Sequence, residues 1–83
     1  MGLIIKRTAV RIFPPETMKN KNDRELLDDV DALMKSLQIP NLSWNISMDI
    51  KGGVMCILTN ITRDEIDLFM DKFDDLGYLL VLL

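Results

Sequence analysis

The chain has 83 residues, no histidine and a single cysteine, Cys56. Histidine is the commonest general base, metal ligand and pH-responsive side chain, so its absence removes most routes to acid–base catalysis. Without a histidine, Cys56 has no partner to activate it as a nucleophile, and one cysteine cannot form an internal disulfide. We therefore expect no enzyme and no catalytic residue, and we interpret Cys56 as a small buried thiol.

Acidic residues recur at helical spacing near the C-terminus, where Asp67, Asp71 and Asp75 stand four apart. Such pairs hold a hard cation weakly, and the chain lacks the alternating acids and following glycine of a calcium loop. Gly52-Gly53 precedes no helix start, which a phosphate-binding loop requires. We expect no metal and no cofactor, and we interpret these acids as the solvated face of a helix.

The composition is that of one folded domain spanning residues 1–83, with 48% hydrophobic and 28% charged residues. The overall charge of −3 is unevenly distributed. Residues 1–22 carry a net charge of +4, whereas segments 23–37 and 62–76 together carry −7. The N-terminal residues lack the pattern of a secretory signal, and no segment is long enough to span a bilayer. We expect a cytoplasmic protein that contacts no membrane.

The best-marked element is a helix between Thr62 and Gly77. Thr62 and Glu65 have the spacing of a capping box, and Ile61 and Ile66 have that of a hydrophobic staple. Gly77 is placed to end the helix in a left-handed conformation. The apolar residues form one stripe, and the acidic residues form an acidic helix face consisting of Asp64, Asp67, Asp71, Asp74 and Asp75.

Strands are predicted at both ends of the chain. Residues 78–83 are all apolar and too few for a helix, which leaves a terminal strand. Residues 3–13 are rich in Ile, Val and Phe and end at Pro14-Pro15. Neither face of this first strand is cleanly polar, and a bulge near Arg7-Thr8 would explain the mixed pattern.

The middle of the chain predicts a polar loop at 16–21, a helix and then a hairpin. Asn22 and Glu25 mark the helix start, and apolar residues recur until Leu37. From Ser43 the period changes to two, predicting a half-buried strand to about residue 50. Lys51-Gly52-Gly53 is typical of a hairpin connection to a return strand at 54–59.

The hairpin register has two alternatives. A two-residue loop places Met55 and Ile57 beside the apolar residues of the preceding strand. A three-residue loop with a bulge instead aligns Val54, Cys56 and Leu58 with them. Both faces of the return strand are apolar in either case, which favours a central position in the sheet.

The predicted order is strand, helix, strand, strand, helix, strand, which is the ferredoxin-like β-α-β-β-α-β pattern of an α+β fold. Right-handed crossovers would place both helices on one face of a four-stranded antiparallel sheet with spatial order 4-1-3-2. The first and third strands would then be central, and the last would be an edge.

This fold leaves apolar surface uncovered, because two helices cover only one face of the sheet. We therefore expect a small non-enzymatic module that self-associates, as a homodimer, or docks a partner protein. The contact would use the open sheet face or the C-terminal edge strand. The expected partner-binding residues are Val54, Cys56, Leu58, Tyr78, Leu80 and Leu82.

Two other functions are weighed against this one. The element order is similar to that of ACT-like domains, which pair side by side and bind amino acids at the interface; this similarity implies a regulatory small-ligand domain. The acidic helices could also occupy the basic cleft of a host nucleic-acid-binding protein, as small viral inhibitors do. Direct RNA binding is not expected, because the third strand offers neither aromatic nor basic residues.

Overall fold

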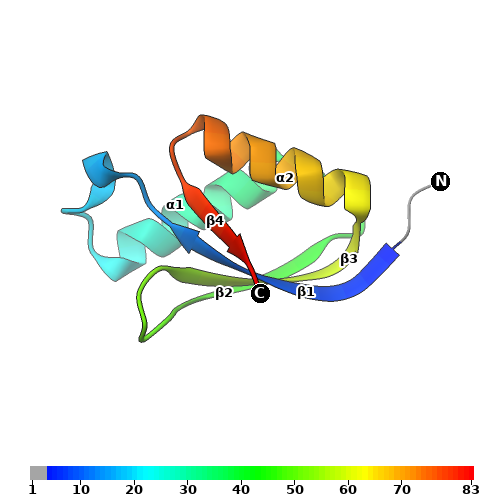
Figure 1. Ribbon diagram of the computed structural model, residues 1–83, viewed down its shortest axis with the longest axis horizontal. Helices are drawn as coiled ribbons and strands as arrows, with labels where there is room; N and C mark the ends of the chain where they lie inside the picture. The colour runs from blue at the N-terminus through cyan, green and yellow to red at the C-terminus, as the bar shows by residue number, and fades with distance from the viewer. Residues whose placement is uncertain (1–3) are drawn as a thin grey trace.

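The computed structural model describes residues 4–83 and contains four strands and two helices (Figure 1). The elements follow the chain as β1 (Ile4–Phe13), the short 3-10 turn η1 (Glu16–Met18), α1 (Asp23–Ser36), β2 (Ser43–Met48), β3 (Val54–Thr62), α2 (Arg63–Asp75) and β4 (Leu79–Leu82). The first residue of the predicted N-terminal strand, Leu3, lies outside the described residues. The turn η1 falls within the segment predicted as a polar loop.

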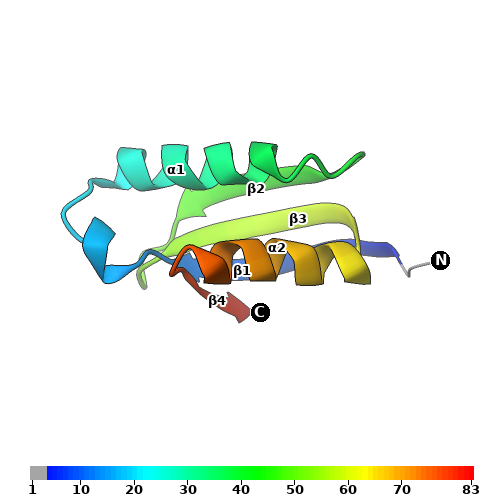
Figure 2. The same cartoon turned by 90° about the horizontal axis from the view of Figure 1, so that it is seen from above.

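The strands form one antiparallel sheet in the order β2-β3-β1-β4. This is the predicted order 4-1-3-2 read from the opposite edge, so the predicted sheet order is confirmed. Both helices lie on the same side of the sheet (Figures 1 and 2). The protein is therefore an α+β domain with one covered and one open sheet face.

Both helices begin with the capping boxes that the sequence predicts. The backbone N–H of Glu25 donates to Asn22 Oδ1 at 2.9 Å, and the N–H of Glu65 donates to Thr62 Oγ1 at 3.2 Å. Each glutamate accepts in return from the backbone N–H of its cap residue. At the end of α2, Gly77 has a φ of 90°, which confirms it as the left-handed stop.

The hairpin between β2 and β3 adopts the second of the two predicted registers. Met48 lies opposite Val54, and Ile46 lies opposite Cys56. The connection consists of residues 49–53, and its glycines have φ values of +99° and +80°. Ile50, expected in the alternating strand, lies instead in this connection and is fully exposed. The strand ends two residues earlier because Asp49 already bonds across the turn to Gly52 and Gly53.

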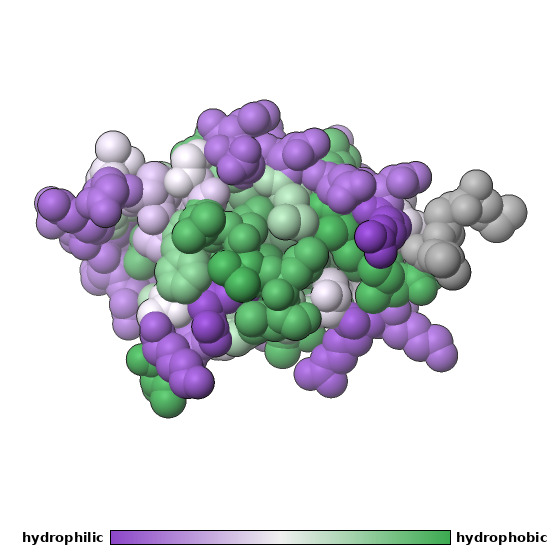
Figure 3. Space-filling view, viewed as in Figure 1, coloured by the Kyte–Doolittle hydropathy of each residue, from purple (hydrophilic) through white to green (hydrophobic). Residues whose placement is uncertain are grey.

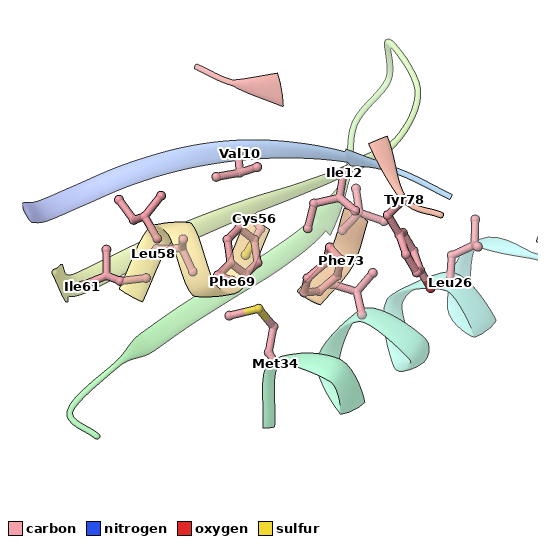
Figure 4. Close-up of a cluster of buried hydrophobic side chains, with 13 residues drawn as sticks. Val10, Ile12, Leu26, Met34, Cys56, Leu58, Ile61, Phe69, Phe73 and Tyr78 are labelled. Atoms are coloured by element: carbon pink, nitrogen blue, oxygen red, sulfur yellow. The ribbon is translucent and has the colours of Figure 1, made fainter. Parts of the chain in front are cut away.

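The core lies between the covered sheet face and the two helices (Figure 4). Within it the Phe69 and Phe73 rings have centroids 4.9 Å apart, and the Tyr78 ring meets Phe73 edge-on at 5.3 Å. These contacts hold the end of α2 against Tyr78, the residue that precedes β4. The fully or nearly buried residues are Val10, Ile12, Leu26, Val30, Met34, Val54, Cys56, Leu58, Ile61, Ile66, Phe69, Phe73 and Tyr78.

The mixed pattern of the first strand has its cause in β3. Asn60 has a φ of 63°, and the buried residues of β3 change from even to odd numbers around it, from Leu58 to Ile61. The pairing of β1 with β3 keeps one register on both sides of Lys6, which stands opposite Asn60. Neither strand inserts an extra residue in this pairing, so the bulge predicted near Arg7-Thr8 does not form there, and the irregularity lies at Lys6 and Asn60.

Candidate protein-binding edge of the sheet

The strand β4 forms an edge of the sheet and exposes most of its apolar side chains. The exposed fractions are 64% for Leu79, 41% for Val81, 50% for Leu82 and 59% for the adjoining Leu83. Figure 3 shows a hydrophobic region over β4, bordered by the hydrophilic surface of α2. In Figure 2, β4 lies outside the edge of α2, so the helix does not cover it. We call residues 79–83 the β4 edge.

The backbone of the β4 edge also offers free hydrogen-bonding groups. The N–H of Leu83 donates to the carbonyl of Ala9 at 2.9 Å, which makes this a hydrogen-bonded pair. Such pairs alternate along antiparallel strands, so Val81 and Leu79 also bond to β1. The N–H and C=O groups of Leu80 and Leu82 therefore point away from β1. Within the described residues these four groups have no partner.

The two edges of the sheet differ in chemical character. At β2, the side chains that face the open side are Ser43, Asn45 and Ser47, all polar. At the β4 edge no residue is polar or charged on either side of the strand. Proteins ordinarily protect a free edge with charged residues, proline or a bulge. The β4 edge therefore has the features of a strand that accepts another strand.

The open face beside the β4 edge combines apolar side chains with one ion pair. Phe13, Met55 and Ile57 are half-buried there. Arg11 extends from β1 to Asp49 in the β2–β3 turn, with Nη2 and Oδ2 2.5 Å apart. The backbone N–H of Lys51 bonds to Asp49 and, with Arg11, lowers the pKa of its carboxyl group. This ion pair holds the turn against the open face.

The structure places four of the six expected partner-binding residues in the core. Val54, Cys56 and Leu58 are at most 1% exposed, and Tyr78 is 4% exposed. Leu80 packs partly against the core from the helix side of the sheet. Among the expected residues only Leu82 is well exposed. The face assigned to β3 in the sequence analysis is thus corrected, since its even-numbered residues 54–58 lie beneath the helices.

The residues that do line the open side were missed because β3 is apolar on both faces. Met55 and Ile57 face the open side of β3, and Leu79 and Val81 face it from β4. The hairpin register, which the sequence left open between two alternatives, decides the face of β3. For β4, the predicted sheet order made it an edge, but its uniformly apolar sequence did not indicate which face is covered.

All five residues of the predicted acidic helix face are exposed. Three of them border two hollows between α2 and the β4 edge. The hollow at the Leu82–Leu83 end is lined by Arg63, Asp67 and Met70, among others. The hollow at the Leu79–Leu80 end is lined by Met70, Asp71 and Asp74. The charge along this flank therefore changes from mixed at one end of β4 to acidic at the other.

Cys56 and Asp31 have pKa values shifted by their surroundings. Cys56 is buried, and burial raises the pKa of its thiol to about 12, as expected for an unreactive thiol. Trp44 packs against the core and donates from Nε1 to Asp31 Oδ1 at 2.9 Å. This bond and Lys35 lower the pKa of the Asp31 carboxyl group. Among residues 4–83, no three potential metal-ligating side chains cluster.

A further concave surface lies between α1 and the start of β4, lined by Met18, Lys21, Asp29 and Tyr78 among others. Its polar groups already have partners within the protein. Lys21 Nζ bonds to Asp29 Oδ2 at 2.6 Å, and the Tyr78 hydroxyl donates to Met18 Sδ at 3.4 Å. A small polar ligand would have to displace these contacts, so this surface carries no ligand assignment.

Comparison of the chain with protein-family models, curated proteins and solved structures gave no match. In the described part of the chain, no helix is long and apolar enough to cross a membrane. The features available for assigning a function are therefore those of the fold and the β4 edge.

Proposed function

We propose that this domain is a non-enzymatic protein-binding module that accepts a β-strand of another polypeptide at the β4 edge. The observation that supports it best is that one strand combines exposed apolar side chains with free backbone groups at Leu80 and Leu82. Backbone hydrogen bonds would supply affinity and the side chains specificity, as in other cases of strand addition. The domain has the ferredoxin-like element order, and this inference of fold family belongs to the same proposal.

The contact extends from the β4 edge onto the open face. On that side Leu79 adjoins the half-buried Phe13, and Val81 adjoins Arg11, whose charge is paired with Asp49. A monomeric protein seldom leaves a contiguous apolar surface of this kind in water. A bound strand would remove the exposed side chains of β4 from solvent and complete its hydrogen bonding in one step.

Two lysine substitutions on neighbouring residues test this role. Leu80→Lys places a charge on the helix side, where Leu80 packs against the core, and should destabilise the fold. Val81→Lys places the same charge on the open side, where 41% of the residue is exposed, and should leave the fold intact. Circular dichroism and urea unfolding establish which variant remains folded.

Binding is measured with a tagged bait co-expressed with an untagged copy in cells of its source. The wild-type bait and a Leu68→Lys control, altered at a 54% exposed leucine of α2 outside both hollows, should retain the same proteins. The folded Val81→Lys bait should lose at least one of them. Identical profiles for all three baits would refute a binding role of the β4 edge.

A further inference from the structure

We infer that the partner strand is the β4 edge of a second copy of this chain, paired antiparallel about a twofold axis that passes between Val81 and its symmetry mate. This inference rests on the proposed function and specifies its partner. The two four-stranded sheets become one continuous sheet, with all helices on the same side. A twofold interface requires one surface patch that is complementary to itself.

The backbone of β4 meets that requirement in a single register. Placing Val81 opposite Val81 of the second copy makes Leu80 and Leu82 a hydrogen-bonded pair across the axis. Both such pairs together use every free N–H and C=O group of Leu80 and Leu82. Centring the axis on Leu80 instead would pair Leu82 with Tyr78, whose N–H already donates to Phe73 at 3.0 Å. The Val81 register alone leaves no group unpaired.

The charges along α2 favour the same antiparallel arrangement. Arg63 lines the hollow at the Leu82–Leu83 end of β4, and Asp74 lines the hollow at the Leu79–Leu80 end. The twofold axis brings the first hollow of one copy opposite the second hollow of the other. The hollow with Arg63 and Asp67 then faces the hollow with Asp71 and Asp74 of the second copy, so Arg63 is attracted to these acids whereas Asp67 is repelled, and this occurs twice. A parallel arrangement would place the acidic end against the acidic end.

The side chains fit an identical strand on both sides of the sheet. On the open side, Leu79 and Leu83 flank the central pair of Val81 residues, and all are apolar. On the helix side, Leu80 and Leu82 alternate with their mates. Met70, which lines both hollows, lies near the axis and is half-buried. The contact therefore has an apolar centre and a charged rim.

Cysteine cross-linking tests the register directly. In a non-hydrogen-bonded antiparallel pair the Cα atoms are about 4.5 Å apart, within the range of a disulfide. Val81→Cys should therefore form a dimer disulfide when oxidised glutathione accepts the two electrons released by the two thiols. The native Cys56 is fully buried and can remain in place.

Leu79→Cys is the matched control. At 64% exposure Leu79 is more accessible than Val81, and it lies on the same side of the strand. In the proposed register it faces residue 83 of the second copy, so the two introduced thiols remain too far apart to join. Cross-linking by random collision would favour Leu79→Cys, whereas the proposed dimer gives a disulfide for Val81→Cys alone.

Charge reversal tests the rim, with the dimer dissociation constant measured by sedimentation equilibrium. Arg63→Glu should raise this constant about tenfold, since two exposed ion pairs become repulsive. Adding Asp74→Arg to the same chain should restore it. Neither substitution should destabilise α2, because an acidic residue stabilises the start of a helix and a basic residue stabilises its end.

A wild-type protein that stays monomeric at several hundred micromolar, with no Val81→Cys disulfide, would overturn this inference. Equal cross-linking of Val81→Cys and Leu79→Cys would overturn the register. The proposed function survives either result if the Val81→Lys bait still loses a different protein. The proposed function fails together with the dimer only if the Val81→Lys bait retains every protein that the wild-type bait retains.

Discussion

Two adjacent glycines in the β2–β3 connection allow a controlled test of how tightly this turn packs against β1. Gly52 and Gly53 both have positive φ, at +99° and +80°. A Cβ atom on Gly52 would meet nothing within 4 Å. A Cβ atom on Gly53 would lie 3.0 Å from the Ile12 carbonyl oxygen and 3.1 Å from the Phe13 ring. Alanine therefore has a backbone penalty at both positions but a steric clash at only one.

The magnitudes follow from these contacts. An alanine in the left-handed region costs about 1–2 kcal/mol, which applies to both variants. Overpacking against a backbone atom of a central strand adds about 1–3 kcal/mol for Gly53→Ala alone. The reduced entropy of the unfolded chain is common to the two variants and cancels in their difference. For a domain of 83 residues, whose total stability is on the order of 4–12 kcal/mol, the second penalty is substantial.

Urea unfolding followed by the fluorescence of Trp44, the single tryptophan, measures both variants. With a denaturant slope of about 1 kcal/mol per molar, the midpoint of Gly53→Ala should lie about 1–3 M below that of Gly52→Ala. Gly53→Ala should cost less in a Phe13→Ala background than in the wild type, because the ring is then absent while the Ile12 carbonyl remains. Coincident midpoints for the two glycine variants would refute the proposed packing of the turn.

Two further predictions concern ionisable groups. Burial raises the pKa of the Cys56 thiol from 9.0 to about 12, so its thiolate fraction at pH 8 is roughly a thousand-fold lower than that of an exposed thiol. A disulfide reagent should therefore label Cys56 only as urea unfolds the protein. Rapid labelling of the native state would contradict the burial of Cys56. The pKa of Asp31 is lowered from 3.8 on folding, so its ionised form stabilises the protein above that pH, and the contribution is lost as the pH falls through the folded value. The difference in urea midpoint between wild type and Asp31→Asn should therefore shrink from pH 7 to pH 3, and a difference that stays constant would show that the charge of Asp31 contributes nothing.

Short-range signals predicted the elements of this fold well. The capping boxes at Asn22 and Thr62 and the stop at Gly77 each depend on residues within one helical turn. Their spacing therefore contains nearly all the information that determines the local structure. The element order and the sheet order followed from these boundaries, because few topologies connect such elements with short loops.

The orientation of β3 could not be predicted, because its two faces are similar in hydrophobicity. Val54 and Met55 are equally suited to a core, and the periodicity that separates the faces of an edge strand is absent. The turn fixes the register at one end, and the left-handed Asn60 changes the covered face near the other. Both depend on backbone geometry that asparagine and glycine permit without requiring it.

Polar contacts between distant segments were also missed. Arg11 and Asp49 are 38 residues apart in the sequence, and Asp31 and Trp44 are 13 apart. No local pattern marks either pair, since each becomes close only when the sheet and helices assemble. The sequence places Arg11 on a strand and Asp49 near a turn, and only the sheet order brings them to the same face.

The exposure of β4 follows from the width of the helix α2, which packs beside it. A helix with its side chains is about 10 Å across, and strands are spaced about 4.8 Å apart, so one helix covers about two strands. The helix α1 contacts β2, whereas α2 contacts both β3 and β4 and leaves the outer side of β4 uncovered. At the opposite edge, Trp44 bonds to α1 and the open-side residues of β2 are polar. The open-side residues are thus polar at β2 and apolar at β4, and α2 leaves the outer side of β4 exposed, which is the contrast on which the proposed binding role rests.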